Sequence, residues 1–141
     1  MSKEMMSSTV KWLNNMKFEG VDSRSHHIPM EATLRFGGSG ANPMPLELLL
    51  SSLGGCIGVD TKYLLKQNGK DYRSFEVKIE GIRRNDLPRI FEKIHAHVKI
   101  AGDLDAQTVK STLDLVMTKM CPIAVIVAAT TDLTWDFELT H

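Results

Sequence analysis

The sequence predicts an α+β fold, and three features of its apolar pattern support this prediction. Three segments alternate apolar and polar residues with the period of two that half-buried strands show. Other segments repeat apolar residues at three-to-four spacing, as the buried face of a helix does. These patterns follow one another as strands, a long helix, a hairpin, further helices and a last strand, which is an order typical of α+β proteins.

The first predicted elements are strands. From Val10 to Leu34, short apolar runs are separated by polar breaks at Asn14-Asn15 and at residues 22–24. This pattern favours an antiparallel meander of two or three strands over a helix. Residues 37–43 follow with three glycines and a proline, a composition typical of a flexible loop.

A long helix is predicted from Pro45 to Asn68. Pro45 can occupy the first turn, and four leucines continue the helical spacing: Leu46, Leu49, Leu50 and Leu53. Asn68-Gly69 offers a stop signal at the other end. The sequence therefore predicts a largely buried helix, with a break or kink at Gly54-Gly55.

The second half of the chain carries a hairpin, two helices and a last strand. Alternating patterns at residues 75–80 and 94–100 flank a polar turn and predict paired strands. Asp105 is the predicted N-cap of an amphipathic helix that runs to Met117. Residues 123–129 are apolar on all sides and predict a short buried helix, and residues 133–139 alternate as a closing strand.

Composition narrows the classes of function. The chain has 141 residues, and we expect one domain over residues 1–141. Lys and Arg number 17, as do Asp and Glu, so nothing suggests a nucleic-acid partner. The longest apolar runs are far shorter than the roughly 20 residues of a membrane-spanning helix. Residues 1–8 lack a secretion signal, and we expect a cytoplasmic protein with no membrane segment.

The two cysteines are the residues most able to carry chemistry. Cys56 follows Gly54-Gly55, where a restarting helix would offer free N–H groups that stabilise a thiolate. A thiolate attacks a peroxide to give a sulfenic acid, which a second thiol converts to a disulfide. Cys121 is the only other thiol. The residues alone leave a second interpretation open, in which both cysteines are small buried hydrophobes.

Residues 45–56 after a glycine-rich Asn-Pro loop, with Cys121-Pro122 downstream, resemble the two cysteine motifs of the osmotically inducible protein C and organic hydroperoxide resistance (OsmC/Ohr) family. Residues 88–95 are similar to an OsmC-like subgroup. This resemblance implies an intertwined homodimer in which antiparallel sheets enclose long central helices. It also implies reduction of organic hydroperoxides, and to some extent of hydrogen peroxide, with two cysteines and no cofactor or metal.

The resemblance also implies roles for individual residues. Cys56 becomes the peroxidatic thiol and Cys121 the resolving thiol, and a dithiol reductant, lipoyl-type in one branch, reopens their disulfide. A Glu and an Arg assist the thiolate in that branch. Glu47 stands one position after the assisting Glu, where this chain has Leu46. Arg24 is the first candidate for the Arg, and Arg35 is the second.

A hydroperoxide with an apolar group is expected beside three apolar residues of the long helix: Leu49, Leu53 and Ile57.

Two alternatives to the enzyme stay open. The first is an OsmC-like dimer that binds a lipid or another small molecule while its cysteines are inert. The second is a metal site formed by Cys56, Cys121 and a histidine, although no short-spaced motif supports it. His95 and His97 share one face of a predicted strand and could also bind a transition metal, but a solvated face explains them as well.

Overall fold

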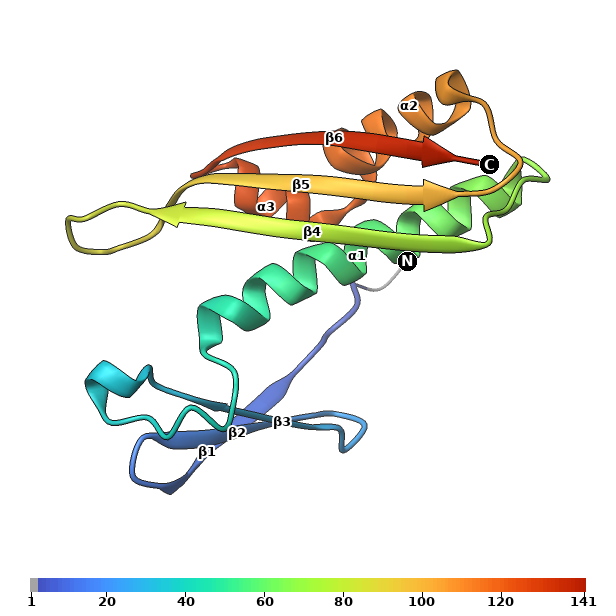
Figure 1. Ribbon diagram of the computed structural model, residues 1–141. Coiled ribbons are helices and arrows are strands. Elements are labelled where there is room, and N and C mark those ends of the chain that lie inside the picture. Colours follow the sequence, from blue (N-terminus) through green and yellow to red (C-terminus); the bar gives the residue numbers. More distant parts are fainter. Residues whose placement is uncertain (1–2) are drawn as a thin grey trace. The chain divides into compact units, whose positions relative to one another are not determined.

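The computed structural model describes residues 3–141, and its chain forms two compact units, Met1–Leu49 and Leu50–His141 (Figure 1). Each unit contains a three-stranded sheet. The helix α1 (Pro45–Gln67) begins in the first unit and continues into the second. The mixture of separate sheets and helices confirms the predicted α+β class.

The first unit is an antiparallel meander. Its strands are β1 (Ser8–Asn14), β2 (Lys17–Asp22) and β3 (His27–Glu31), paired in the order β1-β2-β3. The turns between them contain Asn15 and Ser25, both with positive φ. These turns fall at the polar breaks of the sequence, so the prediction of two or three strands is confirmed.

The loop after β3 is held in place by Glu31. After the 3-10 turn η1 (Leu34–Phe36), the Glu31 carboxylate accepts hydrogen bonds from the Ser39 backbone N–H, from Ser39 Oγ at 3.0 Å and from Asn42 Nδ2 at 2.5 Å. The hydrogen bonds from Asn42 and Ser39 lower the pKa of Glu31 to about 2. Residues 37–43 are irregular, as the sequence predicts, but they are tied to β3 rather than free.

The sheet of the second unit combines both kinds of strand pairing. Strands β4 (Ser74–Arg83) and β5 (Phe91–Ala101) form the predicted antiparallel hairpin. The last strand, β6 (Asp132–Thr140), pairs with β5 in parallel, which the sequence did not predict. A parallel neighbour needs a long crossover, and the three helical segments between β5 and β6 provide it.

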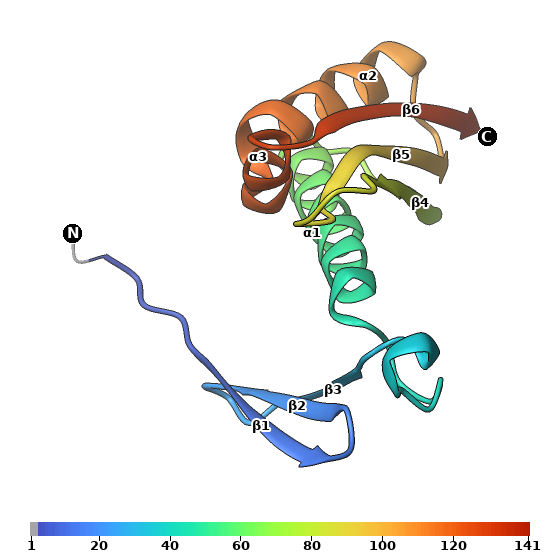
Figure 2. The same cartoon turned by 90° about the vertical axis from the view of Figure 1, so that its left-hand side faces the viewer.

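Helix α1 covers this sheet with a narrow apolar stripe. Its buried residues recur every fourth position: Leu53, Ile57, Thr61 and Leu65. Gly54 lies against β4, because a Cβ built there would be 3.3 Å from Val77 Cγ1. In Figure 2, α1 and α3 lie on the same side of the sheet.

Two predictions about α1 are wrong. The helix is continuous from Pro45 to Gln67, so Gly54-Gly55 does not interrupt it. A glycine costs a helix about 1 kcal/mol, which the packing of Gly54 against β4 can offset. The helix is also not largely buried in this chain, since Val59 is 69% exposed and Tyr63 is 56% exposed.

The crossover consists of α2 (Ala106–Leu115), the π-helical turn η2 (Val116–Met120) and α3 (Pro122–Ala128). Asp105 is the N-cap of α2, as predicted, and its Oδ1 accepts a hydrogen bond from Thr108 N at 2.7 Å. The prediction of a short buried last helix holds for one side of α3 only, because Ala124 and Val127 are buried whereas Ile126 is 69% exposed.

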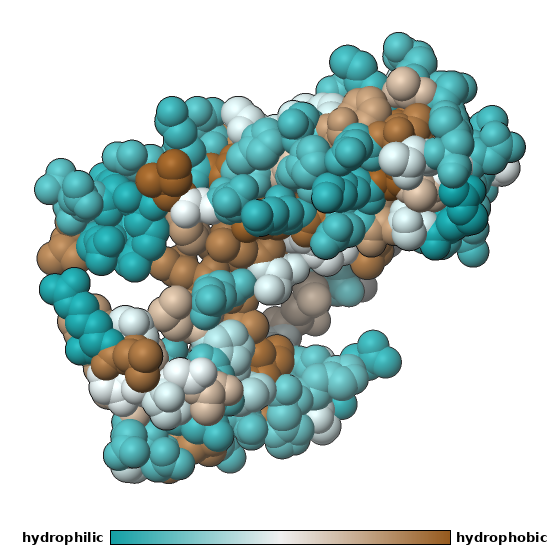
Figure 3. Space-filling model, viewed as in Figure 1, coloured by the Kyte–Doolittle hydropathy of each residue, from teal (hydrophilic) through white to brown (hydrophobic). Residues whose placement is uncertain are grey.

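Apolar length alone does not place a helix in a membrane. By length and composition α1 could cross one, and so could the bent pair formed by 106–120 and 122–128. The core helix of a soluble protein passes the same test. Asp60 and Lys62 lie within α1, and ionisable residues are costly in a bilayer. In Figure 3 hydrophilic residues cover much of the surface over β4 and β5.

Candidate functional site

Cys56 lies in the interior of α1, where its position differs from the prediction. We expected a restarting helix with free N–H groups beside the thiol, but the backbone of α1 is helical on both sides of Cys56. The N-terminal end of α1 is therefore not the source of any activation of this thiol. Cys56 is half-buried and free, so its sulfur is not part of a disulfide.

Cys121 lies at the junction between η2 and α3. Its backbone N–H donates to Val116 O at 2.8 Å and closes the π-helical turn. Its Sγ accepts a hydrogen bond from Ala124 N at 3.3 Å, which makes Cys121 the N-cap of α3. These two bonds fix the thiol in the core, where it is 0% exposed.

The fold brings the two cysteines together, although 65 positions separate Cys56 and Cys121 in the sequence. Cys56 Sγ, Cys121 Sγ and a carboxylate oxygen of Asp60 all lie within 4.8 Å of one another. Since a disulfide has an S–S length of about 2.05 Å, side-chain rotation has to close the remaining gap. The geometry brings the two thiols near each other without bonding them.

The environments of the two sulfurs differ. Burial raises the pKa of Cys121 to about 12, and the neighbouring Cys56 thiol contributes to this increase. Cys121 is therefore a neutral thiol at physiological pH. Cys56 is the more accessible sulfur of the pair. A reagent from solvent would therefore reach Cys56 before Cys121.

Asp60 is the residue of this cluster that our sequence reasoning missed. Its Oδ2 lies 3.9 Å from Cys56 Sγ, within the range of a hydrogen bond that involves sulfur. The two residues are four positions apart on α1, and residues at this spacing are neighbours on a helix surface. That spacing was the signal in the sequence that could have found Asp60.

The predicted helper residues of the first unit have local roles. Glu47 Oε1 accepts a hydrogen bond from Met44 N at 3.0 Å and so caps the first turn of α1. Arg24 is exposed in the turn before β3, where its backbone N–H donates to Asp22 Oδ1 at 2.9 Å. Arg35 stacks over the Phe36 ring, with Cζ 5.5 Å from the centroid. Their roles toward Cys56 stay predictions.

The residues expected beside the substrate divide between core and surface. Leu53 and Ile57 are 0% exposed and pack in the core of the second unit, whereas Leu49 is half-buried in the first unit. Contact of these three with a substrate stays a prediction. Val59 and Tyr63 are the exposed apolar side chains close to Cys56 along α1.

Comparisons of the sequence with known proteins give the family of the chain. A family model described as OsmC-like protein matches residues 37–136. The protein YhfA of Escherichia coli strain K12 is 32% identical over 136 residues, which cover 95% of this chain and 98% of YhfA.

Solved structures share the fold. The OsmC-like protein from Mycoplasma pneumoniae has a TM-score of 0.85 at 14% identity, over 99% of this chain and 100% of that one. The organic hydroperoxide resistance protein OhrB of Bacillus subtilis has a TM-score of 0.69 at 11% identity, over 96% and 98%. Likeness at such low identity concerns the fold alone. With the family match and the YhfA relationship, it shows that this chain belongs to the OsmC-like protein family.

Proposed function

We propose that this protein is a two-cysteine thiol peroxidase that reduces organic hydroperoxides, and to a smaller extent hydrogen peroxide. The observation that carries the proposal is the proximity of a half-buried thiol, Cys56, to a fully buried one, Cys121, within 4.8 Å. The likeness to the fold of OhrB, a protein named for resistance to organic hydroperoxides, supports it.

The proposed cycle starts at Cys56. Its sulfur attacks one oxygen of the hydroperoxide, the O–O bond breaks, and the products are a sulfenic acid on Cys56 and an alcohol. Cys121 then attacks the sulfenic sulfur, which forms a disulfide and releases water. A dithiol, of which a lipoyl group is one example, reduces the disulfide and restores both thiols.

Asp60 is suited to move the proton that this chemistry requires. Its carboxylate lies 3.9 Å from Cys56 Sγ and can accept the thiol proton as the sulfur attacks. The protonated Asp60 can then return the proton to the departing alkoxide, which leaves as the alcohol. The high pKa of Cys121 keeps that thiol protonated until a sulfenic acid forms beside it.

We further propose that the active form is a cytoplasmic homodimer. Val59 and Tyr63 are 69% and 56% exposed on α1, close to Cys56. Monomeric proteins rarely expose large contiguous apolar patches, so a second copy of the chain is the expected cover. The same apolar surface would accommodate the organic group of a hydroperoxide.

Stopped-flow oxidation of the reduced protein by cumene hydroperoxide tests the peroxidase proposal, with hydrogen peroxide as a second oxidant. We expect rapid loss of two thiols per chain. The Cys56→Ser variant should not react, and the Cys121→Ser variant should accumulate a sulfenic acid that dimedone traps. Oxidation no faster than that of a free thiol, or equal reactivity of both single variants, would contradict the proposal.

A small-molecule-binding dimer is the second candidate function, and a pocket favours it. A cavity of about 470 Å³ is lined by Met117, Thr118, Val125, Ala128, Ala129, Leu133 and Trp135. Most of these side chains are apolar, as in typical ligand pockets. Native mass spectrometry of the purified protein would show a retained ligand in this case, and the stopped-flow experiment would show little consumption of peroxide.

A further inference from the structure

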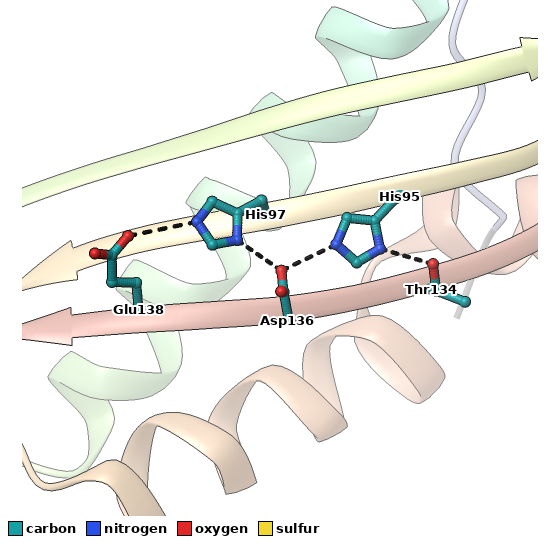
Figure 4. Close-up of polar contacts among 5 residues, drawn as sticks. All are labelled: His95, His97, Thr134, Asp136 and Glu138. Atoms are coloured by element: carbon teal, nitrogen blue, oxygen red, sulfur yellow. Dashed lines mark hydrogen bonds and ion pairs between the residues drawn. The ribbon is translucent and has the colours of Figure 1, made fainter.

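The outer face of the β4–β5–β6 sheet carries a cluster of histidines and carboxylates that the proposed peroxidase cycle does not use. His95 and His97 project from β5, and Asp136 and Glu138 project from the parallel neighbour β6 (Figure 4). The sequence predicts a solvated face here, and the side chains are partly exposed, with 43% for His95, 33% for His97 and 60% for Asp136. They are nevertheless arranged around one common atom.

That common atom is an oxygen of Asp136. Its Oδ1 lies 2.9 Å from His95 Nε2 and 2.6 Å from His97 Nδ1, so one carboxylate oxygen contacts both imidazoles. One ligand atom from each of the three residues lies within 4.8 Å of the others. Around a Zn²⁺ ion, nitrogen and oxygen ligands at about 2.0–2.2 Å from the metal are roughly 3.3 Å apart. Small side-chain rotations would give this spacing.

The outer nitrogen of each imidazole already has an acceptor. His95 Nδ1 lies 2.7 Å from Thr134 Oγ1, and His97 Nε2 lies 3.5 Å from Glu138 Oε2. In protein metal sites, such contacts fix the tautomer of a ligating histidine and aim its other nitrogen at the metal. Here they direct His95 Nε2 and His97 Nδ1 toward the same point, beside Asp136 (Figure 4).

The charged side chains of the neighbouring strand β4 do not repel a cation from this cluster. On β4, Lys78 pairs with His97 and Glu80 pairs with His95 in the strand register. Lys78 Nζ and Glu80 Oε2 lie 4.0 Å apart and carry opposite charges, so they largely cancel. Beside the histidines, Lys99 lies opposite Glu138 and Lys93 opposite Asp132 in the β5–β6 register, so Asp136 leaves the cluster with an excess of negative charge.

We propose that His95, His97 and Asp136 bind a divalent transition-metal ion, with Zn²⁺ as the reference ion. Two imidazoles and a carboxylate suit the borderline ions Zn²⁺, Ni²⁺ and Cu²⁺, and they leave coordination positions open to water. Thr134 and Glu138 orient the two imidazoles through the ring nitrogens that do not bind the metal. The site lies on a β-sheet, so its ligands are held by two hydrogen-bonded strands. The proposal is independent of the peroxidase cycle.

Isothermal titration of Zn²⁺ into the untagged Cys56→Ser/Cys121→Ser protein tests the proposal. This background removes the second cluster of metal-ligand residues found in residues 3–141, which is Cys56, Asp60 and Cys121. We expect one Zn²⁺ per chain. Adding His95→Ala and His97→Ala should abolish saturable binding, and Thr134→Val should weaken it about tenfold. The control pair His26→Ala/His27→Ala should bind normally, since each of these exposed histidines contacts a different carboxylate.

Imidazole NMR spectra of the reduced wild-type protein provide a second readout that does not depend on the cysteine substitutions. Zn²⁺ should shift the ring nitrogens of His95 and His97 and leave those of His26 and His27 unchanged. Any of three results would overturn the proposal. Saturable Zn²⁺ binding could survive the loss of His95 and His97, or it could also be abolished in the His26→Ala/His27→Ala control. The third result is the absence of saturable Zn²⁺ binding to the wild type.

Discussion

At the scale of single residues, the site depends on the difference between its two sulfurs. Cys121 is fixed by two backbone contacts, is 0% exposed and has a pKa raised to about 12. Cys56 is half-buried in the middle of α1 and contacts the carboxylate of Asp60. The sequence predicted both residues but attributed the reactivity of Cys56 to a helix terminus. In the structure, the carboxylate of Asp60 lies 3.9 Å from this thiol, and our proposal assigns proton transfer to it.

Replacing Asp60 by Asn should slow oxidation of Cys56 by cumene hydroperoxide about 100-fold at pH 7, because the amide cannot accept the thiol proton. The loss should shrink at high pH, where hydroxide removes the proton without help. Stopped-flow rates measured as a function of pH would check this.

Asp114→Asn is the matched control, since Asp114 pairs with Lys110 on α2 at 3.1 Å and should not affect the reaction. A loss for Asp60→Asn that is the same at every pH would indicate a structural role instead of proton transfer.

At the scale of elements, Gly54 and Gly55 of α1 have the same low helix propensity but differ in their packing. Comparing their substitutions therefore distinguishes the two effects. A Cβ on Gly55 would meet nothing within 4 Å in its own chain, so in a monomeric Val59→Lys background Gly55→Ala should stabilise the protein by about 0.5–1 kcal/mol. A Cβ on Gly54 would lie 3.3 Å from Val77 Cγ1, and this tight contact should cancel the gain. Thermal unfolding of both variants would show which of them is more stable. A higher Tm for Gly54→Ala than for Gly55→Ala would refute it.

The Glu31 loop should make stability depend on pH. The pKa of Glu31 is lowered from 4.5 to about 2 by its hydrogen bonds, so the folded state favours the ionised carboxylate. This contribution is fully present above about pH 4.5, and it disappears as the pH falls through about 2. Glu31→Gln should therefore be less stable than the wild type at pH 7, and the difference should shrink below pH 4.5.

Urea unfolding between pH 7 and pH 2 would check this dependence. Glu92→Gln on β5, an exposed carboxylate, is the control and should show little difference from the wild type. A difference between Glu31→Gln and the wild type that stays constant over the whole range would contradict the assignment.

The elements that the sequence predicted well are those with local signals. The Asp105 N-cap, the turns of the first meander and the alternation in β4 and β5 all depend on residues close together in the chain. The parallel pairing of β6 depends on the path of a crossover, which no local pattern encodes. The continuity of α1 was missed because Gly54 is compensated by a contact with Val77 from another element.

At the scale of the whole molecule, the exposed apolar side chains of α1 set the expectation for assembly. The leucine-rich sequence of α1 provides more apolar surface than one three-stranded sheet can cover. The structure is consistent with this, because Val59 and Tyr63 lie four positions apart and both are exposed. Our proposal of a homodimer assigns these residues to contact with a second copy, beside the Cys56 thiol.

Light scattering after size exclusion should give the wild type a mass of twice 15.8 kDa. Val59→Lys should shift the protein toward 15.8 kDa, because a charge placed in an apolar interface is costly to bury. Gln107→Lys, a charge added at an exposed position of α2, should leave the mass unchanged. A monomeric wild type would contradict the dimer. If the Val59→Lys monomer also oxidises slowly, the partner contributes to the peroxide site, and if it oxidises at the normal rate, Cys56, Asp60 and Cys121 suffice within one chain.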